Sequence, residues 1–289
     1  MSGSHIGPGG LVLTGEEWLD AHFAAMEPEY LAMVQAAGIC PGFRVLDAGC
    51  GTGPFLPFLR QLVGIHGVVH AVDASPANVR RVEGRVAREG WTNVTVGIAD
   101  LRDGGVTDTA YDVIWCANVT QYLADLELSK VLSGWRRSLR PGGRLAIKEF
   151  DISRLRLDPL PEGLIGRWHA ARCAAGDAHA MALDRTPRLR KVLAEAGFDP
   201  VHAQGFPMIR TPPLRPVEQT LFRELFVFLS TQAVGLELPA EDHHFWSKMS
   251  QVDAEDHPLQ QPGFRYEALQ WLFVGRNGDG LVLGPDTSR

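Results

Sequence analysis

Short apolar runs alternate with amphipathic segments along the first half of the chain. Four runs have the length and composition of buried strands, at residues 43–46, 68–73, 94–100 and 111–118. After the second run, Ser75 is placed as a helix N-cap, and three valines recur at helical spacing: Val79, Val82 and Val86. Residues 126–139 carry another apolar helical face. Strands that alternate with helices in this way predict an α/β fold with a parallel sheet.

The second half continues the alternation with longer interruptions. A Pro-Gly-Gly turn within residues 139–148 leads into a fifth strand. Residues 186–198 combine a threonine cap, a proline in the first turn and a glycine stop, so they predict a helix. Further strands are predicted at 201–203 and 266–274. Together these elements predict a doubly wound sheet of seven strands.

A glycine-rich loop, Asp47-Ala-Gly49-Cys-Gly51-Thr-Gly53, follows the first strand. Alternate glycines let the backbone bend sharply and approach a ligand, and the helix that follows offers unpaired N–H groups. The spacing is G-x-G-x-G, whereas a dinucleotide-binding loop has G-x-G-x-x-G. Asp47 would repel a pyrophosphate and attract an ammonium or sulfonium group. The loop therefore predicts a nucleoside ligand whose far end is cationic.

Residues 45–53 resemble motif I of the class I S-adenosylmethionine-dependent methyltransferases. Three further matches follow in the order of that family: Asp73 after the second strand, Asp100 after the third, and the turn at 139–143. The resemblance spans residues 43–150. It implies a Rossmann-like, mostly parallel sheet with an antiparallel last strand and helical lid insertions. It also implies S-adenosylmethionine as cofactor and S-adenosylhomocysteine as product.

The resemblance assigns the cofactor contacts to the ends of successive strands. Asp73 stands where a doubly wound sheet binds ribose hydroxyls, and Asp100 is assigned to the adenine amino group. The segment that begins at Asn118 flanks the methyl group that is transferred. The cofactor-binding residues predicted in this way are Asp47, Gly49, Gly51, Gly53, Asp73, Ala74, Asn78, Asp100, Leu101, Asn118 and Val119.

Two segments exceed what the core requires, at 152–185 and 207–262. Insertions at the carboxyl edge of such a sheet lie above the ligand crevice, so we expect a substrate lid. The aromatic stripe around Phe222 and Phe226 is equally typical of a core or an oligomer contact. A capping box at Thr14 begins an N-terminal helix, which we expect Pro28 to interrupt.

The predicted divisions follow from these assignments. They are an N-terminal helical cap at 1–40, the cofactor-binding core at 41–151, an inserted lid at 152–185, a core continuation at 186–206, a helical lid or oligomer insertion at 207–262, the last core strand at 263–276 and a flexible tail at 277–289.

The composition of the chain limits the classes of binding partner that we expect. The 289 residues carry a net charge of −6 and no lysine-rich run, so neither nucleic acid nor a membrane is an expected partner. The four cysteines form no C-x-x-C pair, and we find no signal peptide or long apolar span, so we expect a cytoplasmic protein. His243 and His244 are adjacent, and adjacent helical residues point about 100° apart, so no metal is expected.

The reaction that the resemblance implies is methyl transfer from a sulfonium to an aligned nucleophile. A general base is required only for a poorly acidic acceptor. The candidates for a base or a cation-stabilising group are Glu149, His169 and His179. The candidates for acceptor contacts are Tyr30, Tyr122, Phe222 and Phe226.

We therefore expect a small-molecule methyltransferase of secondary metabolism, acting on a terpenoid, polyketide or prenylated alkaloid at carbon or oxygen. An alkene acceptor would need no base. A nicotinamide dehydrogenase is disfavoured by the glycine spacing. A base-flipping enzyme is disfavoured because Asn118-Val-Thr-Gln-Tyr122 is no Asn-Pro-Pro-aromatic motif. A protein methyltransferase and a non-catalytic cofactor-binding protein remain alternatives, and a homo-oligomer formed through the N-terminal helix or residues 207–262 remains open.

Overall fold

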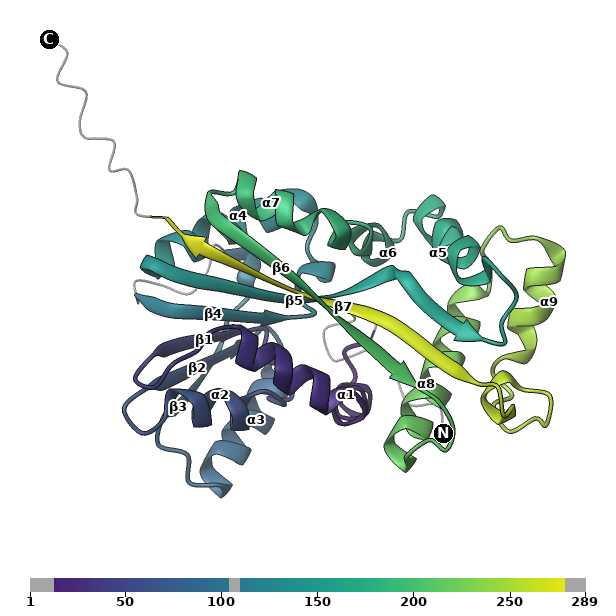
Figure 1. Cartoon of the computed structure of the whole chain (residues 1–289), viewed down its shortest axis with the longest axis horizontal. Coiled ribbons are helices and arrows are strands. Elements are labelled where there is room, and N and C mark those ends of the chain that lie inside the picture. Colours follow the sequence, from purple (N-terminus) through teal and green to yellow (C-terminus); the bar gives the residue numbers. More distant parts are fainter. Residues whose placement is uncertain (1–12, 104–109, 279–289) are drawn as a thin grey trace, which may run out of the picture.

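One sheet of seven strands runs through the molecule (Figure 1). The computed structural model describes residues 13–103 and 110–278. The strand order is β3-β2-β1-β4-β5-β7-β6, and β7 is antiparallel to both of its neighbours. The predicted fold class is confirmed. The strands are β1 (Arg44–Ala48), β2 (Val68–Asp73), β3 (Val94–Ile98), β4 (Tyr111–Ala117), β5 (Leu139–Asp158), β6 (Phe198–Arg210) and β7 (Arg265–Asn277).

Helices cover both faces of the parallel part of the sheet. Alternate residues of a strand point to opposite faces, so Val45 packs with the side of α1, α2 and α3, and Leu46 with the side of α4 and α7. Figure 1 shows these two layers. The helices are α1 (Glu16–Ala36), α2 (Leu56–Val63), α3 (Pro76–Arg88), α4 (Asp125–Ser138), α5 (Leu164–Ala174), α6 (Ala178–Leu183), α7 (Leu189–Glu195), α8 (Pro216–Ala233) and α9 (Ala240–Lys248).

Three strands continue far beyond the parallel core. β5 has 20 residues, and β6 and β7 have 13 each. β5 and β7 shift register between Asp151 and Arg156 and then pair again to Asp158. The expected lid insertions therefore begin as strand, at residues 152–158 and 207–210, because alternate residues there bury apolar side chains such as Leu155, Leu157 and Met208.

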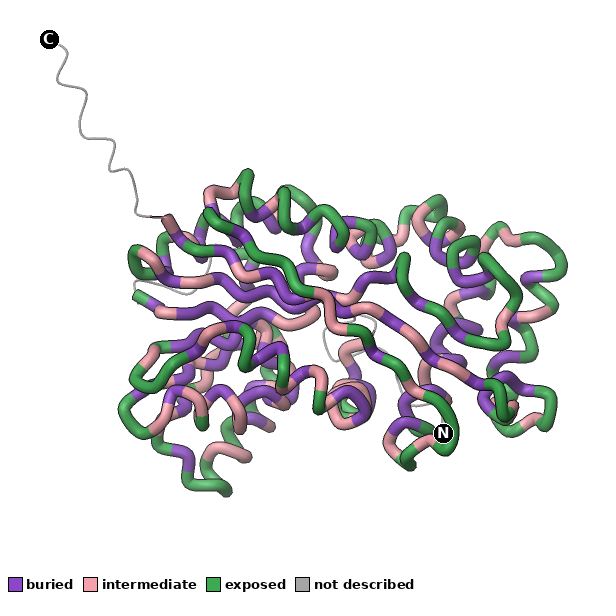
Figure 2. Tube along the Cα trace, in the orientation of Figure 1, coloured by how far each residue is buried: buried purple, intermediate pink, exposed green. Residues whose placement is uncertain are grey.

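The lid helices pack on this extension and on one another. The Trp168 indole of α5 donates to the Leu229 carbonyl of α8 at 3.1 Å. The Arg167 guanidinium of α5 binds both carboxylate oxygens of Asp242 on α9 at 2.7 and 2.8 Å. The aromatic stripe of α8 is buried inside the chain. Figure 2 shows buried and exposed residues alternating along the helices of the molecule.

Helix α1 runs unbroken through Pro28, contrary to the interruption that we expected, and Gly15 rather than Thr14 is its N-cap. Proline removes a helical N–H and displaces the preceding turn. In that turn, the Ala25 carbonyl accepts hydrogen bonds from Arg210 at 2.8 Å and Arg215 at 2.9 Å. The guanidinium groups of Arg210 and Arg215 thus bind the helix backbone in the turn that precedes Pro28.

The expected flexible tail lies almost entirely outside the described residues. Within residues 13–103 and 110–278, no helix is long and apolar enough to cross a membrane.

Arg210 provides a test of how α1 is held. It binds Glu29 of α1 through two bonds at 2.7 and 2.8 Å, and it contacts Glu218 of α8 at 2.9 Å. Its side chain is 11% exposed and that of Glu218 is 7% exposed. Arg210→Met should lower the free energy of unfolding by about 2–4 kcal/mol, because Glu29 loses its cation and Glu218 keeps only Arg215 as a partner.

The matched control is Arg223→Met, which breaks an exposed pair with Asp253. Urea unfolding should show a loss below about 1 kcal/mol for this variant. Equal losses for the two variants would contradict the structural role given to Arg210.

Candidate active site

A cavity of about 540 Å³ opens at the carboxyl ends of the parallel strands. It extends from the glycine loop, past α1, to the inner surfaces of α5 and α8. The loop end is lined by polar groups and the lid end by apolar ones. The site therefore has two chemically different halves within one space.

The glycine loop has the backbone that its sequence requires. Gly49, Gly51 and Gly53 have φ values of 79°, 54° and 75°, which side chains disfavour. A Cβ atom at Gly49 would lie 2.5 Å from the Val119 side chain. The loop is thus packed tightly against the segment after β4.

The Asp73 carboxylate is held in place before any ligand binds. Its Oδ2 accepts the Gly51 N–H at 2.9 Å, and its Oδ1 accepts the Ser75 N–H at 2.8 Å and the Asn78 amide at 3.1 Å. Ser75 is the N-cap of α3, as predicted. Loop, second strand and third helix therefore converge on one carboxylate at the cavity wall.

Asp47 lies beneath the loop in an unfavourable environment for an anion. Burial, and secondly the nearby Asp73 carboxylate, raise the pKa of Asp47 to about 8. Its Oδ2 is buried and has no hydrogen-bond partner among the described residues. A cationic ligand group placed nearby would stabilise the ionised form, as the sequence argument proposed.

Asp100 lines the same half but is engaged by a neighbour. Its carboxylate accepts bonds from the Arg102 side chain at 2.8–3.1 Å, and this hydrogen bonding is the main reason that its pKa is lowered. An incoming amino group would therefore compete with a guanidinium on the same residue or share the carboxylate with it.

Helix α1 closes this half of the cavity from above. The Thr52 hydroxyl of the loop donates to Asp20 of α1 at 2.9 Å, and Arg81 of α3 also binds Asp20 at 2.6 Å. Arg81 makes a further ion pair with Glu16. The first turns of α1 are thereby attached to both the loop and α3.

A polar cluster that sequence reasoning missed lies where the two halves meet. The Lys148 ammonium donates to the Asn118 amide oxygen at 2.8 Å and lies 4.2 Å from the centre of the Tyr30 ring. The Tyr30 hydroxyl lies 3.2 Å from Nε2 of His22. Burial lowers the pKa of Lys148 to about 7. The available signal was a lysine directly after the apolar run Leu145-Ala-Ile147.

The lid half of the cavity is apolar apart from Arg172 and His179. The Arg172 guanidinium is bound by Asp177 at 2.6 and 2.9 Å. The His179 ring stacks on Tyr122 with centroids 5.0 Å apart. The apolar lining comes from Phe150, Ile152, Leu155, Trp168, Leu183, Leu221, Leu225, Phe228 and Leu229.

The structure brings together most of the residues that the sequence singled out. All the predicted cofactor-binding residues line the cavity except Gly53, and Tyr30, Tyr122 and His179 line it too. Phe222 and Phe226 do not, because they face Tyr266 and His257 in the core. The adjacent face of α8 lines the cavity instead.

Two candidate catalytic groups lie outside the cavity lining. Glu149 is adjacent to Lys148 on β5 and so points to the opposite face, where its Oε1 accepts the Thr120 hydroxyl at 2.6 Å. His169 points to Asp184, at 2.8 Å. Strand and helix geometry thus direct both groups away from the ligand space.

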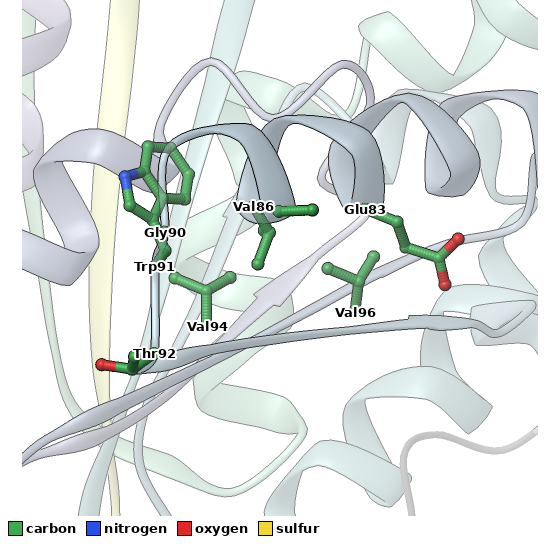
Figure 3. A pocket seen from close by; sticks show the side chains of 8 residues that line it. Glu83, Val86, Gly90, Trp91, Thr92, Val94 and Val96 are labelled. Atoms are coloured by element: carbon green, nitrogen blue, oxygen red, sulfur yellow. The ribbon is translucent and has the colours of Figure 1, made fainter.

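A second recess of about 380 Å³ lies between α3 and β3 (Figure 3). Val86, Trp91, Val94 and Val96 dominate its lining, and Glu83 is its one charged residue. No group of polar side chains converges there, so it offers little for specific recognition.

Comparison with known proteins identifies the core. The profile of a family described as "Methyltransferase domain" matches residues 45–143. Residues 45–143 therefore form a methyltransferase domain. The glycine loop, Asp73 and Asp100 all lie within the matched residues, so the resemblance read from the sequence is confirmed.

Two curated relatives show the range of the methyltransferase similarity. The 27-O-demethylrifamycin SV methyltransferase of Amycolatopsis mediterranei is 29% identical over 181 residues, covering 61% of this chain and 62% of that protein. A tRNA (adenine(58)-N(1))-methyltransferase of Thermus thermophilus is 36% identical over 126 residues, covering 37% of this chain and 48% of that protein. The chain thus spans only about half the length of such relatives.

A solved structure extends the likeness of fold over most of the chain. The phosphoethanolamine N-methyltransferase 2 of Haemonchus contortus, in complex with S-adenosyl-L-methionine, has a TM-score of 0.56 and 17% identity. The match covers 90% of this chain and 57% of that one. At this identity the likeness concerns the fold.

The Asp73 carboxylate of the methyltransferase domain gives a direct test of the cofactor site. Asp73→Ala should weaken S-adenosylmethionine binding by at least about 100-fold, because charge-assisted hydrogen bonds to a carboxylate contribute roughly 1.5–3 kcal/mol each. Calorimetry measures the change. Asp112→Asn, which breaks a pair with Arg140 outside the cavity lining, should leave affinity unchanged. Equal affinity in wild type and Asp73→Ala would refute the assignment.

The raised pKa of Asp47 leads to a second prediction, which concerns the pH dependence of cofactor binding. With a pKa of about 8, Asp47 is mostly protonated at pH 7, and a cationic ligand favours the ionised form. Cofactor binding at pH 7 should therefore release close to one proton, and affinity should fall below pH 8 by up to about tenfold per unit. Calorimetry in buffers of different ionisation enthalpy counts the protons. Asp47→Asn should abolish the release; its persistence there would assign the proton elsewhere.

Proposed function

We propose that this protein transfers the methyl group of S-adenosylmethionine to a hydrophobic small molecule of secondary metabolism, such as a terpenoid, polyketide or prenylated alkaloid. The observation that carries the proposal is the continuity of the cavity. A cofactor held by the glycine loop and Asp73 would face a chamber with apolar walls. None of the residues that the structure describes separates the two halves.

The size of the cavity supports a small acceptor. The whole cavity, with the cofactor half included, has a volume of about 540 Å³, which lies within the range typical of small-molecule sites, and the apolar chamber is only a part of it. Helices α1, α5 and α8 and the strand extension surround it. Burial of an apolar acceptor there gains roughly 25 cal/mol per Å² removed from water.

When bound, the cofactor supplies an electrophilic methyl group on a sulfonium. The protein contributes orientation: Asp73 and the loop fix the nucleoside, and Asp47 offers a counter-charge to its cationic end. Alignment of nucleophile and electrophile lowers a barrier by about 7–11 kcal/mol in well-oriented systems. The lid keeps water from the reacting centre.

Among Glu149, His169 and His179, His179 is the group at the cavity wall. Burial, and secondly the Arg172 charge, lower its pKa to about 4, so it is neutral at pH 7 and a weak base. This supports an acceptor that needs little proton removal, such as an alkene carbon, over an aliphatic alcohol. We assign His179 to acceptor contact.

The tRNA-modifying relative makes nucleic-acid methylation the second candidate. Against it stand the net charge of −6 and an enclosed apolar chamber in place of a basic groove. A protein methyltransferase would likewise need an open groove. We retain a cytoplasmic location and an acceptor-binding role for Tyr30 and Tyr122 as parts of the proposal.

Methyl transfer from isotopically labelled cofactor tests the proposal. Acceptor panels should include prenylated aromatics, terpenoids and macrolide-type polyketides, with transfer RNA and a basic peptide in parallel. Product in the apolar panels alone is the expected outcome. Label in RNA or peptide alone would overturn the small-molecule proposal, and tight cofactor binding without any product would favour a non-catalytic role.

His179→Phe tests the absence of a strong base. The phenyl ring retains stacking on Tyr122, so turnover should fall by less than about tenfold. Loss of a true general base costs roughly 10²–10⁴-fold. A loss of that size, with cofactor affinity unchanged, would identify His179 as the base.

A further inference from the structure

Three chemically different metal-ligating side chains converge on the lid, outside the methyltransferase cavity. His169 and Cys173 are one helical turn apart on α5, and Asp184 caps the carboxyl end of α6. Within the described ranges this is the one group of three or more such residues whose ligand atoms all lie within 4.8 Å of one another. None of the three lines the cavity.

The distances among the His169 nitrogen, the Cys173 sulfur and the two Asp184 carboxylate oxygens approach those of a zinc site. His169 Nε2 lies 2.8 Å from Asp184 Oδ1, and Cys173 Sγ lies 3.7 Å from both His169 Nε2 and Asp184 Oδ2. Around a tetrahedral zinc with bonds of 2.0–2.3 Å, ligand atoms stand roughly 3.3–3.7 Å apart. The sulfur distances fit as they are, and the nitrogen–oxygen pair needs to open by about 0.5 Å.

The backbone that carries these ligands is fixed independently of them. The Arg172 guanidinium binds Asp177 at 2.6 and 2.9 Å, which ties α5 to the start of α6. Arg185, next to Asp184, donates to the Thr120 carbonyl at 2.6 Å and the Leu123 carbonyl at 2.9 Å. The three ligands are therefore largely preorganised, which lowers the cost of binding an ion.

Charge and exposure also suit a divalent ion. A thiolate, a carboxylate and a neutral imidazole balance a charge of +2, and the thiol proton passes to solvent on binding. The His169 side chain is 11% exposed whereas that of Asp184 is 52% exposed. The exposed side provides an entry path and leaves the fourth position to water.

We propose that His169, Cys173 and Asp184 form a binding site for a zinc-class divalent cation that joins α5 to α6. Mixed nitrogen, sulfur and oxygen ligands favour such an ion over magnesium or calcium. The ion takes no part in methyl transfer. It reinforces the outer side of the wall whose inner side presents Trp168, Arg172 and His179 to the acceptor.

Cobalt(II) titration of chelator-treated, reduced protein is the first test. A thiolate–cobalt charge-transfer absorption should appear in wild type, and zinc chloride should abolish it. Cys173→Ser should lose the absorption, and Asp184→Asn should bind at least about tenfold more weakly. Cys40→Ser and His244→Ala are the matched controls, because each removes an exposed cysteine or histidine that lies outside the proposed site. Both variants should bind cobalt as the wild type does.

Thermal unfolding provides a second readout that does not need catalysis. Zinc at 100 times its Kd should raise the Tm of wild type by roughly 3–6 °C and leave that of Cys173→Ser unchanged. Should Cys173→Ser fail to fold, Asp184→Asn at an exposed side chain serves in its place. No absorption in wild type, or absorption and Tm shifts that persist in both ligand variants, would overturn the proposal.

Discussion

The Arg210 guanidinium is the interaction on which the closed shape of the cavity depends. It joins Glu29 and the Ala25 carbonyl of α1 to Glu218 of α8, and it does so from the far end of β6. Without Arg210, Glu29 would have no cation in a largely buried space, and Glu218 would keep only Arg215 as a partner. The covering helix, the lid and the strand extension are thereby held as one unit around the chamber.

The strand extension explains how one fold supports two chemically different surfaces. The parallel strands end at the glycine loop, Asp73 and Asn118, where backbone groups and carboxylates are available to a polar ligand. β5, β6 and β7 continue past that edge and present apolar side chains such as Ile152 and Tyr266. The boundary between polar and apolar lining therefore coincides with the edge beyond which only β5, β6 and β7 continue.

Sequence patterns predicted the parallel half of the molecule well because its signals are local. Glycine spacing, the Ser75 cap and acids at strand ends each act within a few residues. The lid was predicted only as an insertion. The strand character of residues 152–158 and 207–210 depends on pairing with β7, more than 50 residues away in sequence. Likewise, Phe222 and Phe226 share a stripe with the cavity-lining Leu221 and Leu225, and only packing decides which face meets the ligand. Lys148 was missed because its partners, Asn118 and Tyr30, come from distant segments.

Helix α1 is anchored with very different strength at its two ends. Near Pro28 its contacts are largely buried and charge-assisted. Near Glu16 and Asp20 they are ion pairs with side chains 65% and 47% exposed, which salt screens and which contribute little each. The segment with the lowest free energy of local opening separates first. The amino-terminal turns therefore leave the loop before the carboxyl-terminal turns leave the lid. The amino-terminal turns of α1 can thus move about a point near Pro28. A change in ionic strength therefore alters the contacts above the nucleoside pocket and leaves the contacts around the acceptor chamber in place.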